Sequence, residues 1–131
     1  MSALSVTVGI DVAKGHLDAC VLNCTCEVQR FDNDSEGHSA LAATLKPLCV
    51  GLVVMEATGG YEAALACALQ AAGLAVAVVN PRQARDFAKS MGELSKTDKV
   101  DARMLRDFAD VLARHKDRAK YITPLMDAQR L

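Results

Sequence analysis

The sequence predicts a mixed α/β fold in which one sheet is covered by helices on both faces. Residues 5–33 contain three strand-like segments joined by short turns. From residue 39 onward, segments of helical periodicity alternate with apolar strand-like segments. This order gives a hairpin meander followed by βαβ crossovers, which is most simply a ribonuclease H-like sheet.

The N-terminal part predicts three successive antiparallel strands. Residues 5–12 (SVTVGIDV) are rich in β-branched side chains and end in a polar turn, as a buried strand does. Lys14 and Gly15 form that turn, so residues 16–23 are predicted to be a second strand, joined to the first as a hairpin. Residues 26–33 (CEVQRFDN) predict the third strand.

A short helix and a buried strand are predicted next. The break after the meander contains Asp34 and Ser35, and either residue is suited to cap a helix N-terminus. The helix is predicted over residues 39–48 and is ended by Pro47. Residues 49–57 (CVGLVVMEA) are almost continuously apolar, which is typical of a strand covered on both faces.

The following segments predict helix, strand and helix. Residues 60–73 have apolar side chains at helical spacing, and Gly73 fits the C-terminal cap. The apolar stripe of this helix is predicted to contain Tyr61, Leu65, Ala68, Leu69 and Ala72. Residues 74–80 predict another buried strand, and a helix over 81–92 begins with a proline at its first position.

The last predicted helix runs from Thr97 to about His115 and carries two acids near its start. Asp98 and Asp101 are three residues apart, so on a helix they project from neighbouring points of one face. The apolar stripe of this helix contains Val100, Met104, Leu105, Phe108, Val111 and Leu112. Asp101 falls inside the stripe, where a carboxylate needs a cation or hydrogen-bond donors. Two interpretations stay open at this point. Either Thr97 or Asp98 is the N-cap and Asp101 is simply favoured in the first turn, or the two acids bind a divalent metal.

Composition fits a single domain of 131 residues, of which 51% are hydrophobic. No apolar run approaches the roughly 20 residues that span a bilayer, and the N-terminus lacks the basic region of a signal peptide. Five cysteines show no paired zinc-site spacing, which favours reduced thiols in a cytoplasmic protein.

Charge is distributed unevenly along the chain. Residues 1–80 carry a formal charge of −5, whereas residues 81–131 carry +4. A basic part beside an acidic part is a modest indication of a polyanionic partner. The residues suited to contact phosphates are Arg82, Arg85, Lys89, Lys96, Lys99, Arg103 and Arg106. A solvated, ion-paired surface explains these residues equally well.

Four acids are expected to meet at one edge of the sheet. Binding sites of open α/β sheets form beyond the carboxyl ends of the strands. Asp11 and Glu56 end two strands that are predicted neighbours, and the helix carrying Asp98 and Asp101 returns to the same edge. Close carboxylates repel one another unless cations bind, and Mg²⁺ or Mn²⁺ prefers such oxygen ligands. Two such ions about 4 Å apart would serve a phosphodiester displacement.

Three motifs of the chain are distinctive: GIDVAK (9–14), VVMEATGGYE (53–62) and VVNPRQARDFAKSMGELSKTDKVDA (78–102). Together they resemble the N-terminal domain of DEDD-type insertion-sequence transposases. The family is the "one-ten" group of insertion sequences, which also includes Piv-type DNA invertases. The resemblance covers nearly all of residues 6–112, and the combination of MEATGGYE with KTDKVDA is specific.

The resemblance implies a RuvC-like catalytic domain over residues 1–115. Residues 116–131 would then begin a connector towards an absent C-terminal domain with a nucleophilic serine. The four metal-binding catalytic acids, which would hold two Mg²⁺ or Mn²⁺ ions, are carried over onto Asp11, Glu56, Asp98 and Asp101. The family further implies a bacterial, nucleoid-associated DNA recombinase that works as an oligomer with DNA and a structured guide RNA. This chain alone is not expected to complete recombination.

Three other functions remain alternatives. A Holliday-junction-type RuvC-like nuclease shares the acids but not the KTDKVDA and MEATGGYE runs. In a nucleotide-binding half of an actin-like or sugar-kinase-like protein, GIDVAK would be a phosphate loop, but a second similar domain would be needed. In a non-catalytic scaffold for RNA or DNA, the acids would act only as caps.

Overall fold

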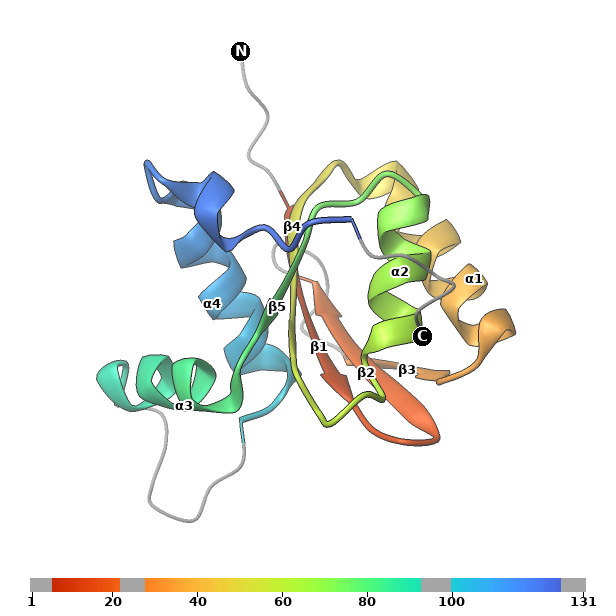
Figure 1. Cartoon of the computed structure of the whole chain (residues 1–131), viewed down its shortest axis with the longest axis horizontal. Coiled ribbons are helices and arrows are strands. Elements are labelled where there is room, and N and C mark those ends of the chain that lie inside the picture. Colours follow the sequence, from red (N-terminus) through yellow and green to blue (C-terminus); the bar gives the residue numbers. More distant parts are fainter. Residues whose placement is uncertain (1–5, 22–27, 93–99, 126–131) are drawn as a thin grey trace.

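The computed structural model describes residues 6–21, 28–92 and 100–125 (Figure 1). In chain order, its elements are β1 (Val6–Val12), β2 (His16–Val21), β3 (Gln29–Asp32), α1 (Ser35–Leu45), the 3₁₀ turn η1 (Lys46–Leu48), β4 (Val50–Glu56), α2 (Ala63–Ala71), β5 (Val76–Val79), α3 (Pro81–Ser90), α4 (Ala102–Arg114) and the 3₁₀ turn η2 (Arg118–Tyr121).

The five strands form one mixed sheet in the order β3-β2-β1-β4-β5. The pairs β1–β2 and β2–β3 are antiparallel, whereas β1–β4 and β4–β5 are parallel. The predicted meander and crossovers are therefore confirmed. The register pairs Ile10 of β1 with Met55 of β4, so Asp11 and Glu56 come next, side by side, at the ends of the two strands.

Helices cover both faces of the sheet, as predicted (Figure 1). The face under α1 and α2 is closed by aliphatic side chains, among them Val8, Ile10 and Val12 of β1. Because side chains alternate along a strand, Thr7, Gly9 and Asp11 belong to the other face. That face packs on α3 and α4 through a second apolar cluster.

The contact between α4 and β1 is made directly over Gly9. A Cβ at Gly9 would overlap the backbone of Arg106 and Ala102 and would lie 2.6 Å from the carbonyl carbon of Leu105. Only glycine lets the helix backbone approach the strand this closely. The first turn of α4 is thereby held over β1 two residues before Asp11.

The predicted start of one helix is wrong because of its cap. The first helix begins at Ser35 rather than at residue 39, and Asp34 is its N-cap. The Asp34 side chain accepts a hydrogen bond from Gly37 N at 2.7 Å, which starts the helix four residues early. Asp34 was one of the two predicted caps, so that part is confirmed.

The predicted start of the last helix is wrong in the opposite direction, because α4 begins at Ala102 rather than at Thr97. Asp101 has extended backbone and is the N-cap, so it precedes the helix and does not lie in its buried stripe. The buried residues of α4 are Ala102, Leu105, Ala109 and Leu112. Small residues belong to this stripe because α4 lies so close to the sheet.

Two predicted core side chains are exposed instead. Val111 of α4 is 46% exposed, and Tyr61, which precedes α2, is 49% exposed. Tyr61 lies before the first turn of α2, which begins at Ala63, and therefore does not share its buried face. Phe108 packs on the flank of α4, where its ring stacks on Phe87 of α3 at a centroid distance of 4.7 Å.

The segment after α4 covers the edge of β5. Thr123 N donates to Val76 O at 2.8 Å, and Thr123 Oγ1 accepts from Val78 N at 2.9 Å. Gln70 of α2 donates to Thr123 O and Pro124 O, both at 3.1 Å. The predicted domain boundary at residue 115 stays a prediction. Within the described ranges, none of the helices has the length and apolar character that crossing a membrane requires.

Candidate functional site

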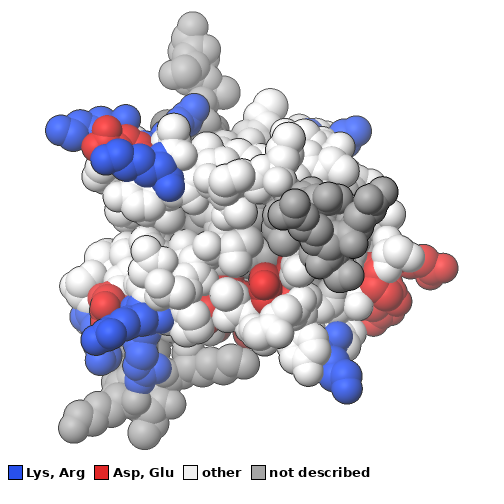
Figure 2. Space-filling model, viewed as in Figure 1, with Lys and Arg blue, Asp and Glu red and all other residues white. Residues whose placement is uncertain are grey.

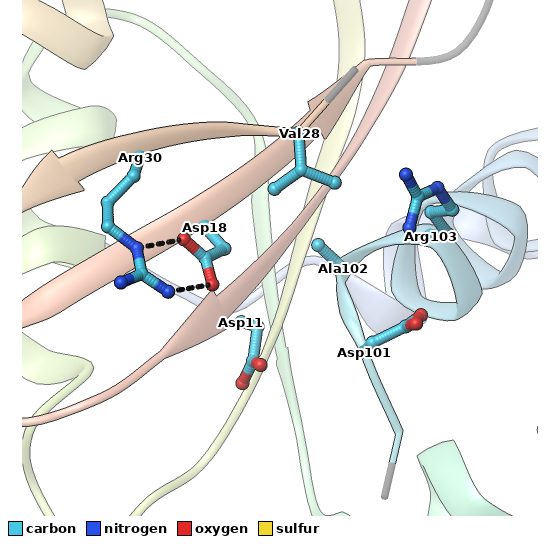
Figure 3. A pocket seen from close by; sticks show the side chains of 7 residues that line it. All are labelled: Asp11, Asp18, Val28, Arg30, Asp101, Ala102 and Arg103. Atoms are coloured by element: carbon cyan, nitrogen blue, oxygen red, sulfur yellow. Dashed lines mark hydrogen bonds and ion pairs between the residues drawn. The ribbon is translucent and has the colours of Figure 1, made fainter. Parts of the chain in front are cut away.

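A cavity of about 400 Å³ opens where α4 begins, over the C-terminal end of β1 and the start of β2 (Figure 3). One wall is formed by the sheet and the other by the first residues of α4. The lining residues are Asp11, Asp18, Val28, Arg30, Asp101, Ala102 and Arg103. Five of these seven residues are charged, so the cavity wall consists mainly of carboxylates and guanidinium groups.

Asp11 and Glu56 are brought together by the sheet. They follow the last register pair of β1 and β4, and neighbouring strands lie about 4.8 Å apart. Both belong to the face covered by α4, since Gly9 and Val54, two residues earlier in each strand, pack there. Both side chains are half-buried. The expected convergence of these two acids agrees with the topology.

Asp101 reaches the cavity from the opposite wall. Its carboxylate accepts a hydrogen bond from Met104 N at 3.1 Å and is otherwise exposed. In Figure 3 this carboxylate turns towards its own helix rather than towards Asp11. Asp101 is therefore itself the N-cap, a position predicted for Thr97 or Asp98, and one of its carboxylate oxygens is left for another ligand. Asp98 lies outside the described residues.

The donor set has the chemistry that a hard divalent cation prefers. Carboxylate oxygens are the preferred protein ligands of Mg²⁺ and Mn²⁺, and the cavity has room for an ion with its waters. In the part of the chain that the structure describes, however, no three His, Cys, Asp or Glu side chains are grouped closely enough to hold a metal. The residues thus fit the ion in kind, but Asp101 would have to turn towards Asp11.

Sequence reasoning missed Asp18 and Arg30. Asp18 pairs with Asp11 across β1 and β2, and Arg30 pairs with Asp18 across β2 and β3. Arg30 Nε and Nη2 donate to the two oxygens of Asp18 at 2.8 and 3.1 Å. This bond raises the pKa of Arg30. The signal was the hairpin: a turn at Lys14 fixes the register, and the register sets Asp18 opposite Asp11.

The turn after Glu56 is closed by a carboxylate of the chain itself. Glu62 Oε1 accepts hydrogen bonds from Thr58 N at 2.8 Å, Thr58 Oγ1 at 3.0 Å and Gly60 N at 3.1 Å. Burial raises the pKa of Glu62, but these hydrogen bonds outweigh it and hold the pKa below its usual value. The N–H groups of this turn therefore bind Glu62, and the ATGGYE sequence fixes the position of the strand end.

A buried histidine and an asparagine tie the two strand ends together. Asn33 Nδ2 donates to Ala13 O at 2.8 Å, just after β1, and to Tyr61 O at 3.1 Å, in the turn after β4. Its oxygen lies 2.6 Å from His38 Nε2, which must be the donor because an amide oxygen can only accept. Burial lowers the pKa of His38. This network holds the loops that follow the strands carrying Asp11 and Glu56.

The predicted basic residues lie in different environments. Figure 2 shows Lys and Arg gathered over α3, where Arg82 and Lys89 are exposed and Arg85 is half-buried. Arg103 lines the cavity. Arg106 differs, because its guanidinium donates to Asp107 Oδ1 at 3.0 and 3.1 Å and to buried Cys20 Sγ at 3.3 Å. Lys96 and Lys99 lie outside the described residues. Phosphate binding by all seven stays a prediction.

Comparison with solved structures identifies the fold. Thermus thermophilus RuvC aligns with a TM-score of 0.55 and 16% identity, over 92% of this chain and 99% of that chain. RuvC of the same organism in complex with a Holliday junction substrate aligns over the same shares with a TM-score of 0.58. At 16% identity this likeness shows the fold alone. It confirms the predicted ribonuclease H-like, RuvC-like fold.

Comparison of sequences identifies the family. The pilin gene-inverting proteins of Moraxella lacunata and Moraxella bovis are each 34% identical to this chain over 108 residues. The alignments cover 75% of this chain and 32% of each relative, so the chain spans about a third of their length. The family model of DEDD transposases of the IS110 type, described as "Transposase", matches residues 8–130. As the predicted resemblance required, this chain belongs to the IS110-type DEDD transposase family.

Proposed function

We propose that this chain is the metal-dependent catalytic domain of a DNA transposase or recombinase and acts on DNA phosphodiesters. The carrying observation is the arrangement of three acids in a transposase-family chain. Asp11 and Glu56 end adjacent strands, and Asp101 lies on the facing wall of a polar cavity. Phosphoryl chemistry asks a protein mainly for positioning and charge, and such a cavity supplies both.

In this proposal, Asp11, Glu56, Asp98 and Asp101 hold one or two Mg²⁺ or Mn²⁺ ions. When bound, the metal stabilises charge on the attacking and leaving oxygens of the phosphodiester. Asp11 and Glu56 provide rigid ligands, because the sheet fixes their backbone. Asp101 would provide an adjustable ligand, because only one of its carboxylate oxygens accepts a hydrogen bond from Met104 N and its side chain is exposed.

Basic residues contact the DNA backbone in this proposal. Arg103 lies in the cavity wall, and Arg82 and Lys89 extend the cationic surface over α3. Such contacts give affinity and salt dependence but carry no choice of sequence. The proposal includes Arg85, Lys96, Lys99 and Arg106 as predicted, with Arg106 the weakest member since its guanidinium is engaged with Asp107 and Cys20.

On the basis of family membership, we propose further that this chain is part of a longer protein. It would work as an oligomer in the bacterial nucleoid, with DNA and a structured guide RNA as partners. Residues 1–115 would form its catalytic domain, and residues 116–131 would lead to a domain with a nucleophilic serine.

The test is a pair of isosteric substitutions, Asp11→Asn and Glu56→Gln. We expect each to weaken Mn²⁺ binding and to reduce metal-dependent cleavage of DNA at least about a hundredfold, while the folded state is retained. Mn²⁺ affinity is measured by calorimetry and the fold by circular dichroism. Asp110→Asn is the matched control, because Asp110 is an acid of α4 outside the cavity, paired with Arg114.

A non-catalytic nucleic-acid scaffold is the second candidate. It is favoured by the use of Asp101 as a helix cap and by the absence of a ready group of three acids among the described residues. This function predicts that Asp11→Asn leaves Mn²⁺ affinity and cleavage at wild-type values. That result would replace the catalytic proposal with the scaffold.

A further inference from the structure

Arg30 is placed at the cavity by a short ladder of charged residues across three strands. Asp11, Asp18 and Arg30 are successive cross-strand partners, so all three side chains lie on the face that α4 covers. Figure 3 shows Arg30 and Asp18 joined beside Asp11 on the sheet wall of the cavity. Two carboxylates opposite each other repel, and the guanidinium compensates the pair.

The way Arg30 binds Asp18 leaves half of its guanidinium available. The edge formed by Nε and Nη2 is engaged with the carboxylate, and these are the only two hydrogen bonds of the Arg30 side chain within the described ranges. A guanidinium carries five N–H groups. Nη1 and the second hydrogen of Nη2 therefore form a second, unused edge. The Arg30 side chain is 64% exposed, so this edge is accessible.

The unused edge has the geometry that binds phosphate. Two parallel N–H groups of arginine match two oxygens of a phosphate, which a lysine ammonium cannot do. Arg30 and Arg103 lie on opposite walls of the same cavity, one on β3 and one on α4. A strand whose phosphodiester reaches Asp11 would therefore lie between two guanidinium groups.

We propose that Arg30 binds a backbone phosphate of the nucleic-acid strand at this site, and that Asp18 is the positioning residue that orients it. The inference rests on the proposed function, since it requires a nucleic-acid strand at the cavity. It adds a β3 residue that the motifs of the chain do not include. The shared ligand chemistry is a phosphodiester, of DNA or of RNA.

The chain contains a matched control for this test. Arg114 donates through Nε to Asp110 at 3.1 Å and is 69% exposed, against 2.8 Å and 64% for Arg30 with Asp18. The acid partners are similarly covered, with side chains 28% and 22% exposed. Arg30→Gln and Arg114→Gln thus remove the same charge from similar surface ion pairs. Only Arg30 lines the cavity.

The experiment measures binding of labelled single-stranded DNA, and of RNA of the same sequence, by the whole chain over a range of salt concentrations. We expect Arg30→Gln to weaken binding about tenfold at low salt. The negative slope of log affinity against log salt should become less steep by about 0.7, the value of one phosphate contact on a single strand. Arg114→Gln should leave both at wild-type values. The oligonucleotide that shows the change identifies the strand that Arg30 contacts.

Arg30→Lys separates charge from orientation. It should restore the salt slope but not the full affinity, because lysine keeps the charge and loses the fork that Asp18 orients. The inference about Arg30 is overturned if Arg30→Gln binds both oligonucleotides with the same affinity and salt slope as Arg114→Gln. In that case the proposed function still stands, because the wild-type chain binds nucleic acid. A wild-type chain that binds neither oligonucleotide would overturn both.

Discussion

Helices α1 and α4 pack on opposite faces of one sheet, and they share two features: an aspartate N-cap and a close glycine contact with a strand. Each begins at an aspartate cap: Asp34 binds Gly37 N at 2.7 Å, and Asp101 binds Met104 N at 3.1 Å. Each also meets a strand through a glycine. Gly37 of α1 lies against the backbone at the end of β3, and Gly9 of β1 lies under the backbone of α4.

The surroundings of these two helix starts differ. Under α1 and α2 the sheet face stays apolar along β1, from Val8 to Val12. Under α4 the apolar cluster gives way to acids, because the helix begins only at Ala102 and leaves the ends of β1 and β2 uncovered. The same local chemistry thus makes a plain helix start on one face and a site wall on the other. In the proposed function, Asp101 differs from Asp34 because the residues opposite its cap are acids of a polar cavity.

The largest expected difference between the two helix starts comes from adding a methyl group at each glycine contact. Gly9→Ala and Gly37→Ala both force a Cβ into backbone atoms, of Ala102 and Arg106 in one case and of Asp32 in the other. We expect each to lower the free energy of unfolding by about 1–3 kcal/mol, measured by urea denaturation. Only Gly9→Ala should also weaken Mn²⁺ binding, since it displaces α4 and with it Asp101.

Equal Mn²⁺ affinities in the two alanine variants would contradict this account. The position of α4 on β1 would then not set the distance between Asp101 and the strand ends. A crystal structure of Gly9→Ala gives an independent measure, because α4 should be shifted away from β1 while the β1–β4 register is retained.

The two caps sharpen the comparison with a smaller effect. Asp34→Ala and Asp101→Ala each remove an N-cap and should cost about 1 kcal/mol of unfolding free energy. Asparagine caps a helix as well as aspartate, so Asp34→Asn and Asp101→Asn should keep wild-type stability. Asp101→Asn alone should lose Mn²⁺ affinity and cleavage. Full metal binding by Asp101→Asn would show that Asp101 is a cap and nothing more.

The sequence predicted the fold, and the strand ends that carry Asp11 and Glu56, because both follow from local pattern; the metal-binding role of these acids stays a prediction. β-branched runs, turns and Pro81 mark the elements, and the crossover order makes β1 and β4 neighbours. Asp11 and Glu56 then meet without knowledge of any side-chain contact. The start of α4 was misplaced since both Asp98 and Asp101 are good caps, and local preference does not choose between them.

Asp18 and Arg30 were missed for a different reason. Their importance depends on register across three strands, and register is a property of pairs of strands rather than of one segment. The sequence also did not show that Gly9 is the contact point of α4 on β1. GIDVAK shows a glycine in a strand, but only the packed structure shows that the backbone of α4 lies on it.

The smallest expected effect concerns pH and the network under α1. Burial lowers the pKa of His38 below its value of 6.5 in the unfolded chain, so the unfolded state binds the proton more readily. The stability linked to His38 is therefore complete above pH 6.5 and falls as the pH drops below it. His38→Gln keeps a donor for Asn33 but does not titrate. Urea denaturation between pH 8 and about pH 5 should therefore show a shallower loss of stability for His38→Gln than for the wild type. Identical profiles for wild type and His38→Gln would mean that the buried imidazole is protonated without cost, and that the Asn33 network does not depend on a neutral His38.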